Sequence, residues 1–293
     1  MSAHPGTPPH PHPLTARAAA PVAVDSHAHV FLQRLPLASA RRYAPAFDAT
    51  PAQYLGLLDA HGITHGVLVQ PSFLGNDNRF LLDTLRAHPG RLRGVVMTDP
   101  AADEKELASL DAAGVVGVRL NLVGQPLPDL GTPGWQTFLA RLKALDWHLE
   151  LHREAADLPA LLDAALPAGC RIVVDHFGRP HAAQADGDLG FAALLRRAAS
   201  GRVWVKLSAA YRNARGVPQA DAQSACACAR ALLEAFGPER LVWGSDWPHT
   251  QHQDQADYAR SLGALADWVP DAAQRRRILG ETAAELFRIP PAI

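Results

Sequence analysis

Short β-branched runs alternate with longer amphipathic segments from residue 22 to the C-terminal end of this chain. The short runs are typical of buried strands, and they fall at 22–30, 63–71, 92–99, 115–122, 147–153, 171–177, 202–209 and 240–248. Helical spacing of apolar residues marks segments between them, such as 78–88, 103–114, 134–145, 157–166 and 224–237, and two further helices are expected at 257–269 and 281–289. Eight strand-then-helix units over about 270 residues predict an α/β fold, a single (β/α)8 TIM barrel spanning residues 22–293.

The alternative fold is an open, doubly wound sheet. Such a sheet usually carries a glycine-rich phosphate loop after its first strand, and this chain has neither a G-x-G-x-x-G nor a Walker motif. The barrel is therefore favoured. It predicts that the active site lies at the carboxyl ends of the strands.

The first 21 residues differ in composition from the rest of the chain. They are rich in proline and small residues and lack the apolar centre of a signal peptide, so we expect a disordered tail over 1–21. Its histidines, His4, His10 and His12, can bind metal adventitiously. Since no apolar stretch approaches the roughly 20 residues that span a bilayer, a soluble protein is predicted.

Charge and cysteine content narrow the functional classes. The formal net charge is -1 and no basic run occurs, which argues against nucleic-acid and membrane-surface partners and favours a small molecule. The three cysteines, Cys170, Cys226 and Cys228, cannot form an even disulfide framework, so we expect reduced thiols and a cytoplasmic location. The alanine-rich outer helices present no clear self-complementary face, and the oligomeric state is left open.

Polar residues terminate several of the predicted strands. His27 and His29 end the first strand on one face, since alternate side chains of a strand point the same way. His152 ends the fifth strand, His176 the sixth and Asp246 the eighth. A single histidine at such a place is more often structural than functional. Four imidazoles and a carboxylate at one end of one barrel indicate a common site that binds a metal or an acidic substrate.

The motifs around these residues carry a resemblance. The stretches "VDSHAHVF", "IVVDHFGRP", "VWVKLSA" and "LVWGSDWPH" occur in this order, and with them the chain resembles the amidohydrolase superfamily from about residue 22 to its end. Within that superfamily it is most similar to the amidohydrolase-related branch that opens pyrone dicarboxylates, sulfomuconolactone and sugar lactones. The resemblance implies a hydrolase of aromatic-acid or sugar-acid catabolism that opens a small acidic lactone by attack of water on the ring carbonyl.

The resemblance also implies a set of site residues. His27, His29, His152 and Asp246 match a one-metal site, and neutral imidazoles with one carboxylate suit zinc or manganese. Asp246 would also take the proton of water, and His176 would lie next to the reacting carbonyl. Pyrone dicarboxylate hydrolases work without metal and have tyrosine where His152 stands, so this histidine favours metal. A metal-free mechanism stays open, with Asp246 as an unaided base whose pKa burial would raise.

An acidic substrate requires fixed cations. Arg119 ends the fourth strand, Arg179 follows the sixth and Arg212 the seventh, and their guanidinium groups can form a ring that holds a carboxylate or sulfonate. Arg215 is an equal rival to Arg212. Gln125 stands where the resembled dicarboxylate hydrolases have a further arginine, which weakens the case for a dicarboxylate substrate.

Several assignments stay open in the sequence. Ser72, in the loop after the second strand, is a candidate hydrogen-bond partner for the substrate. Lys206 either takes part in catalysis or pairs with an interior carboxylate such as Asp25. In the resembled superfamily, two-metal sites are bridged by a carbamylated lysine at the end of the fourth strand. This strand ends in Arg119 and Asn121 instead, so a two-metal site is not expected. The alternative functions are a metal-dependent decarboxylase of the same superfamily, lactone isomerisation, and a non-catalytic barrel that binds an acidic metabolite.

Overall fold

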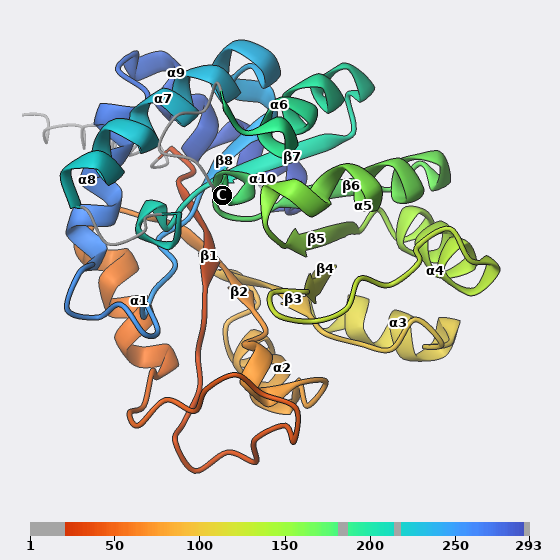
Figure 1. Cartoon of the computed structure of the whole chain (residues 1–293). Coiled ribbons are helices and arrows are strands. Elements are labelled where there is room, and N and C mark those ends of the chain that lie inside the picture. The colour runs from red at the N-terminus through yellow and green to blue at the C-terminus, as the bar shows by residue number, and fades with distance from the viewer. Residues whose placement is uncertain (1–20, 181–186, 214–217, 290–293) are drawn as a thin grey trace, which may run out of the picture.

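A computed structural model describes residues 21–180, 187–213 and 218–289 of the chain (Figure 1). Apart from Pro21, the tail expected over 1–21 lies outside these residues, and so does Arg215. In the described part of the chain, no helix is both long and apolar enough to cross a membrane. All three cysteines are free thiols.

The expected (β/α)8 barrel is confirmed. Its strands are β1 (Val24–Ala28), β2 (His65–Val69), β3 (Leu92–Val96), β4 (Val115–Asn121), β5 (His148–His152), β6 (Arg171–Val174), β7 (Val203–Leu207) and β8 (Leu241–Trp243). They form one parallel sheet in sequence order, and each strand lies inside a run predicted from the sequence. Beyond the end of β8, Asp246 N–H donates to the carbonyl of His27 (2.8 Å), and Ala28 pairs with Trp247, which joins the last strand to the first.

Helices surround the sheet, as Figure 1 shows. They are α1 (Pro51–Ala60), α2 (Arg79–Ala87), α3 (Glu104–Ala112), α4 (Pro133–Ala144), α5 (Leu158–Ala165), α6 (Leu189–Arg196), α7 (Pro218–Phe236), α8 (Tyr258–Trp268), α9 (Ala272–Leu279) and α10 (Glu281–Leu286). The seven helices named from the sequence are present, and α1, α6 and α9 add to them. Helix α1 begins with a capping box, in which Thr50 and Gln53 satisfy each other's backbone N–H groups.

Alternation along the strands divides the barrel into an outer and an inner core. Outward-facing residues such as Leu68 and Leu149 pack in one large cluster with helix residues such as Leu85 and Leu162. Inward-facing valines form a second cluster with Leu286 and Phe287 from the end of α10; these valines are Val24, Val67, Val69, Val95, Val116, Val173 and Val242. The polar residues that follow these valines toward the carboxyl ends of the strands build the candidate site.

Candidate active site

A small cleft lies at the carboxyl ends of the strands. Most residues that the sequence proposed for the site line this cleft, namely His29, Ser72, Arg119, His152, His176, Arg212 and Asp246. Two more lie against it, since His27 is fully buried beneath the cleft and Arg179 contacts His152. The topology therefore brings the predicted site residues together.

His27 in β1 and His29 just after it are held in different ways. The ring of His29 lies with Nδ1 2.7 Å from the carbonyl oxygen of Val69. Because a carbonyl oxygen only accepts, Nδ1 carries the proton and Nε2 keeps a free lone pair. His27 lies just past the middle of β1, and its Nε2 is buried without a hydrogen-bond partner in the described structure. Burial and the nearby Lys206 ammonium lower the pKa of His27 well below its ordinary value, so this imidazole is neutral.

One carboxylate oxygen of Asp246 faces three imidazoles. Its Oδ1 lies 3.7 Å from Nε2 of His27, 3.7 Å from Nε2 of His29 and 3.9 Å from Nε2 of His176. This oxygen is buried and accepts no hydrogen bond from the described residues. Asp246 also has a φ of 60°, a left-handed backbone conformation that aspartate rarely adopts. Such a strained residue with an unsatisfied buried oxygen is characteristic of a functional site.

The other carboxylate oxygen of Asp246 is firmly bound. Its Oδ2 accepts hydrogen bonds from the Tyr211 hydroxyl (2.5 Å) and from Nε of Arg212 (2.7 Å). Burial alone would raise the pKa of Asp246, but the charge of Arg212 and the contact with His176 hold this pKa well below its ordinary value. The metal-free mechanism considered above required a raised pKa, and this expectation is wrong. Asp246 is an ionised carboxylate, and Oδ1 is the oxygen left for chemistry.

His176 lies in the short turn η4 (His176–Gly178) directly after β6. Its Nδ1 is 2.8 Å from the Ser208 hydroxyl. Burial lowers the pKa of His176 to about 3, with Asp246 acting in the opposite direction. The imidazole is therefore neutral at ordinary pH, and it can either accept or donate one hydrogen bond through Nε2.

His152 stands apart from the expected metal ligands. Two groups of described residues have ligand atoms within 4.8 Å of one another, His27 with His29 and Asp246, and His27 with Asp175 and His176. His152 belongs to neither group. Its Nδ1 is 3.0 Å from Nη2 of Arg119, and its Nε2 is 3.4 Å from Nη1 of Arg179. Guanidinium groups only donate, so an arginine occupies the lone pair that a metal would need.

A layer of buried charged side chains lies next to the site residues. Nζ of Lys206 lies 2.5 Å from Oε2 of Glu150, 3.4 Å from Oδ1 of Asp175 and 3.0 Å from Nδ1 of His27. Arg119 completes the layer, with Nη2 3.1 Å from Oδ2 of Asp175. Of the two roles open for Lys206, ion pairing with interior carboxylates is present, although its partners are not Asp25. Asp25 instead binds Ser245 through both carboxylate oxygens.

The arginines expected to hold the substrate already have carboxylate partners. Arg119 pairs with Asp175, and Arg212 pairs with Asp246. Nη1 of Arg179 lies 3.6 Å from Oε1 of Glu154. In the described chain these three cations therefore neutralise protein carboxylates.

Sequence reasoning missed several residues of the cleft. Tyr211 binds Asp246, and its signal was its place next to Arg212 in "SAAYRNARG". Arg42, Tyr43 and Thr250 also line the cleft. Arg42 and Tyr43 come from the long segment between β1 and α1, and nothing in the local sequence connects that segment to the strand ends.

The candidate ligands have the chemistry of a divalent-metal site. His27 Nε2 and Asp246 Oδ1 are buried and lack hydrogen-bond partners among the described residues. Nδ1 of His27 also lies 3.3 Å from Oδ1 of Asp175, and with its proton directed to this carboxylate the His27 ring presents the Nε2 lone pair, as the His29 ring does. A buried polar atom without a partner costs folding free energy unless a ligand or ion binds it. Two imidazoles and one carboxylate are a donor set that zinc and manganese accept. The residues present therefore fit such an ion.

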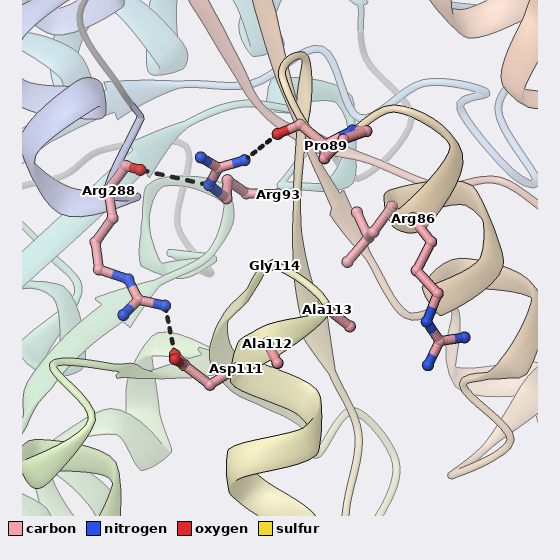
Figure 2. A pocket seen from close by; sticks show the side chains of 9 residues that line it. Arg86, Pro89, Arg93, Asp111, Ala112, Ala113, Gly114 and Arg288 are labelled. Carbon is pink, nitrogen blue, oxygen red and sulfur yellow. Dashed lines mark hydrogen bonds and ion pairs between the residues drawn. The ribbon is translucent and has the colours of Figure 1, made fainter.

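Figure 2 shows a larger cavity near the amino ends of β3 and β4. Its arginines bind neighbouring carboxylate and carbonyl oxygens: Nη2 of Arg288 donates to Oδ1 of Asp111 (2.7 Å) and to the carbonyl of Val115 (2.9 Å), and Nη1 of Arg93 donates to the carbonyl of Pro89 (2.8 Å). The described residues that line this cavity include no histidine, serine, cysteine or tyrosine. Its lining carboxylate, Asp111, is paired with Arg288, so the cleft at the carboxyl ends is the candidate active site.

A parallel (β/α)8 barrel with histidines and an aspartate converging at its carboxyl ends is the architecture of a barrel hydrolase. The family model for amidohydrolases matches residues 24–289. The chain belongs to the amidohydrolase family.

Two of the relatives of this chain carry the names of lactone hydrolases. It is 35% identical over 86% of its length to a 2-pyrone-4,6-dicarboxylate hydrolase of Comamonas testosteroni, covering 84% of that protein. It is also 35% identical over 90% of its length to a 4-sulfomuconolactone hydrolase of Rhizobium radiobacter, covering 89% of it.

Solved structures of related hydrolases have a similar fold. A putative 2-pyrone-4,6-dicarboxylic acid hydrolase from Pseudomonas putida is 48% identical with a TM-score of 0.84, over 92% of this chain and 98% of that one. An amidohydrolase from Burkholderia multivorans, solved with bound zinc, is 26% identical with a TM-score of 0.77, over 92% of this chain and 100% of that one.

Proposed function

We propose that this protein hydrolyses a small acidic lactone to the ring-opened hydroxy acid. The observation that carries the proposal is the position of Asp246 Oδ1, 3.7 to 3.9 Å from the Nε2 atoms of His27, His29 and His176, beside a cleft lined by arginines. An ionised carboxylate next to neutral imidazoles can activate water and polarise a carbonyl. The lactone-hydrolase names of the relatives support the same reaction.

His27, His29 and Asp246 would hold one divalent ion, zinc or manganese. The zinc in the Burkholderia multivorans amidohydrolase supports this choice. When bound, the ion supplies Lewis acidity, which lowers the pKa of water from about 15.7 to about 7 and so allows attack near neutral pH. The orientation of the ligands comes from the chain itself, because Val69 fixes the His29 ring and the carbonyl of His27 binds the backbone N–H of Asp246.

Asp246 would carry the proton of the attacking water. Tyr211 and Arg212 occupy Oδ2, so Oδ1 receives this proton as the oxygen of water bonds to the lactone carbonyl carbon. The ring C–O bond then breaks, and Asp246 returns the proton to the departing alkoxide. The product is a hydroxy acid, and its new carboxyl group loses one proton to the solvent near neutral pH.

His176 would stabilise the negative charge that develops on the carbonyl oxygen. With the Ser208 hydroxyl donating to Nδ1, the neutral ring carries its proton on Nε2, on the side of Asp246. A neutral donor at this place stabilises an oxyanion without first neutralising Asp246. His152 and Arg179 lie on the neighbouring side, where they would orient the substrate rather than hold the metal.

The test is an assay of a panel of lactones in which the release of protons is measured. The panel holds 2-pyrone-4,6-dicarboxylate, 4-sulfomuconolactone and L-fucono-1,5-lactone, assayed with the wild type, Asp246→Asn and Asp254→Asn. Asp254 is exposed in the loop after β8 and makes the matched control. We expect one proton and one 18O atom from labelled water in each product molecule, with activity lost only in Asp246→Asn. Product without 18O would indicate isomerisation, release of carbon dioxide would indicate decarboxylation, and either result would refute the proposal.

A further inference from the structure

Arg42 differs from the other arginines of the cleft in its partners. Its guanidinium forms no ion pair with any residue that the structure describes, and the group found against it is the ring of Tyr43, with 5.8 Å from Cζ to the ring centre. Arg119 and Arg212, by contrast, each bind a buried carboxylate. Arg42 is therefore an uncompensated cation of the cleft.

The segment that carries Arg42 is fixed to the barrel. Phe31 and Ala49 pair through two backbone hydrogen bonds of 2.8 and 2.9 Å, which close the segment between β1 and α1 at its base. Next to Arg42, the Tyr43 hydroxyl lies 2.9 Å from Oγ1 of Thr250, and the Tyr43 ring packs on Phe73 with 5.3 Å between centres. These contacts hold the backbone of Arg42 at the rim of the cleft.

The side chain of Arg42 reaches the far wall of the cleft. Gly124 follows β4 with a φ of +71°, and a Cβ atom added there would lie 3.6 Å from Cδ of Arg42. The arginine stem thus packs over the loop after β4. Asp246 and His176, which would contact the reacting carbonyl, come instead from the ends of β8 and β6.

The local field is positive at Arg42. Partial burial lowers the pKa of Arg42 and Tyr43 opposes this shift, while the charges of Arg212 and Arg119 lower the pKa further; a guanidinium nevertheless keeps its proton at any ordinary pH. Glu154 acts in the opposite direction, but Arg153 (3.3 Å) and Arg179 (3.6 Å) already share this carboxylate. A cation held among like charges in a narrow cleft attracts an anion.

We propose that Arg42 binds an acidic group of the substrate and determines the preference of this enzyme for lactones that carry a carboxylate or sulfonate away from the reacting carbonyl. The inference rests on the proposed lactone hydrolysis. A guanidinium matches both anions because its two parallel N–H groups can donate to two oxygens at once. Since this contact is made in the ground state and kept in the transition state, it acts on KM and leaves kcat nearly unchanged.

The first experiment compares Arg42→Gln and Arg42→Lys with Arg41→Gln. Both arginines are exposed, and Arg41 is the matched control because it donates to the carbonyl of Ala38 (2.9 Å) and does not line the cleft. For the acidic lactone that the wild type hydrolyses, we expect Arg42→Gln to raise KM about 10- to 100-fold, the range of one charge-assisted hydrogen bond. Arg42→Lys should recover part of this loss. With the neutral D-glucono-1,5-lactone, all variants should match the wild type.

The second experiment measures binding without turnover. Benzene-1,3-dicarboxylate has two carboxylates and no ester, and calorimetry should show that Arg42→Gln weakens its Kd by the same factor as KM. Equal binding by the wild type, Arg41→Gln and Arg42→Gln would overturn the role of Arg42 while leaving lactone hydrolysis intact. Equal losses on acidic and neutral lactones would also overturn it, since they would indicate a structural role. Arg42-dependent binding in a protein that opens no lactone would instead refute the proposed function and support the anion site.

Discussion

The Nε atom of Arg212 lies 2.7 Å from Oδ2 of Asp246, and Asp246 is buried whereas Arg212 is partly buried. The sequence assigned this arginine to the substrate, whereas the structure uses it to hold the carboxylate of the site. The pair occupies one oxygen of Asp246 and leaves the other oriented toward three imidazoles. Arg212 is thus a positioning residue for the proposed base.

Replacing Arg212 should therefore affect kcat more than KM. Arg212→Gln removes the charge that depresses the pKa of Asp246, so this pKa rises and the acid limb of the pH–rate profile shifts to higher pH. We expect kcat to fall roughly 10- to 100-fold from the loss of a charged hydrogen bond, on neutral and acidic lactones alike. Steady-state kinetics from pH 4 to 9 will measure both effects. A rise in KM confined to acidic lactones would restore the substrate role that the sequence suggested.

Metal content separates the ligand set seen in the structure from the one predicted by the sequence. We expect about one zinc or manganese ion per chain in the wild type and in His152→Gln, and loss of this ion in His29→Gln. Elemental analysis after dialysis gives the ratio, and all three proteins carry the same histidines in residues 1–21, so adventitious binding there cancels. Loss of metal in His152→Gln would return His152 to the ligand set.

Buried neutral histidines should make the metal-free protein sensitive to acid. The pKa of His176 falls from its ordinary 6.5 to about 3 on folding, because burial disfavours the charged ring. Between these two values the unfolded chain binds a proton that the folded chain does not, so stability decreases as the pH falls below 6.5. His27 and His152 have pKa values shifted in the same direction by burial and add to the loss.

Urea unfolding with a chelator present, from pH 4 to pH 8, tests this sign. His176→Asn should reduce the slope of unfolding free energy against pH by up to about 1.4 kcal/mol per pH unit below pH 6, the contribution of one proton. Above pH 7 the two proteins should have parallel profiles. Identical slopes at acidic pH would show that His176 takes up a proton in the folded state.

Lys206 should be essential for stability although it lies outside the cleft. Lys206→Met leaves Glu150 and Asp175 buried without their ammonium partner, which typically costs about 3 to 5 kcal/mol. The double variant Lys206→Met, Glu150→Gln removes one of the stranded charges, so it should be more stable than the single variant. Urea denaturation and circular dichroism will rank the three proteins. A single variant within about 1 kcal/mol of the wild type would contradict ion pairing as the role of Lys206.

The barrel itself could be predicted from the sequence because its signals are local. The β-branched runs, their spacing and the helical periodicity between them depend only on neighbouring residues, and all eight runs contain a strand in the structure. The convergence of His27, His29, His176 and Asp246 followed from the same pattern, since parallel strands of a barrel bring their carboxyl ends to one rim.

The partners of the charged side chains could not be predicted in this way. Arg119 meets Asp175, and Lys206 meets Glu150, across 56 positions of chain in both cases, and strand alternation says which face a residue occupies but not which neighbour it contacts. The sequence by itself determined the fold and the residue types at the strand ends. Only the tertiary structure decided that Arg42 lies exposed at the cleft without an ion pair to a described residue, that His152 faces arginines and that Arg212 holds Asp246. Burial makes cations such as Arg119 and Lys206 bind the carboxylates that folding places within reach.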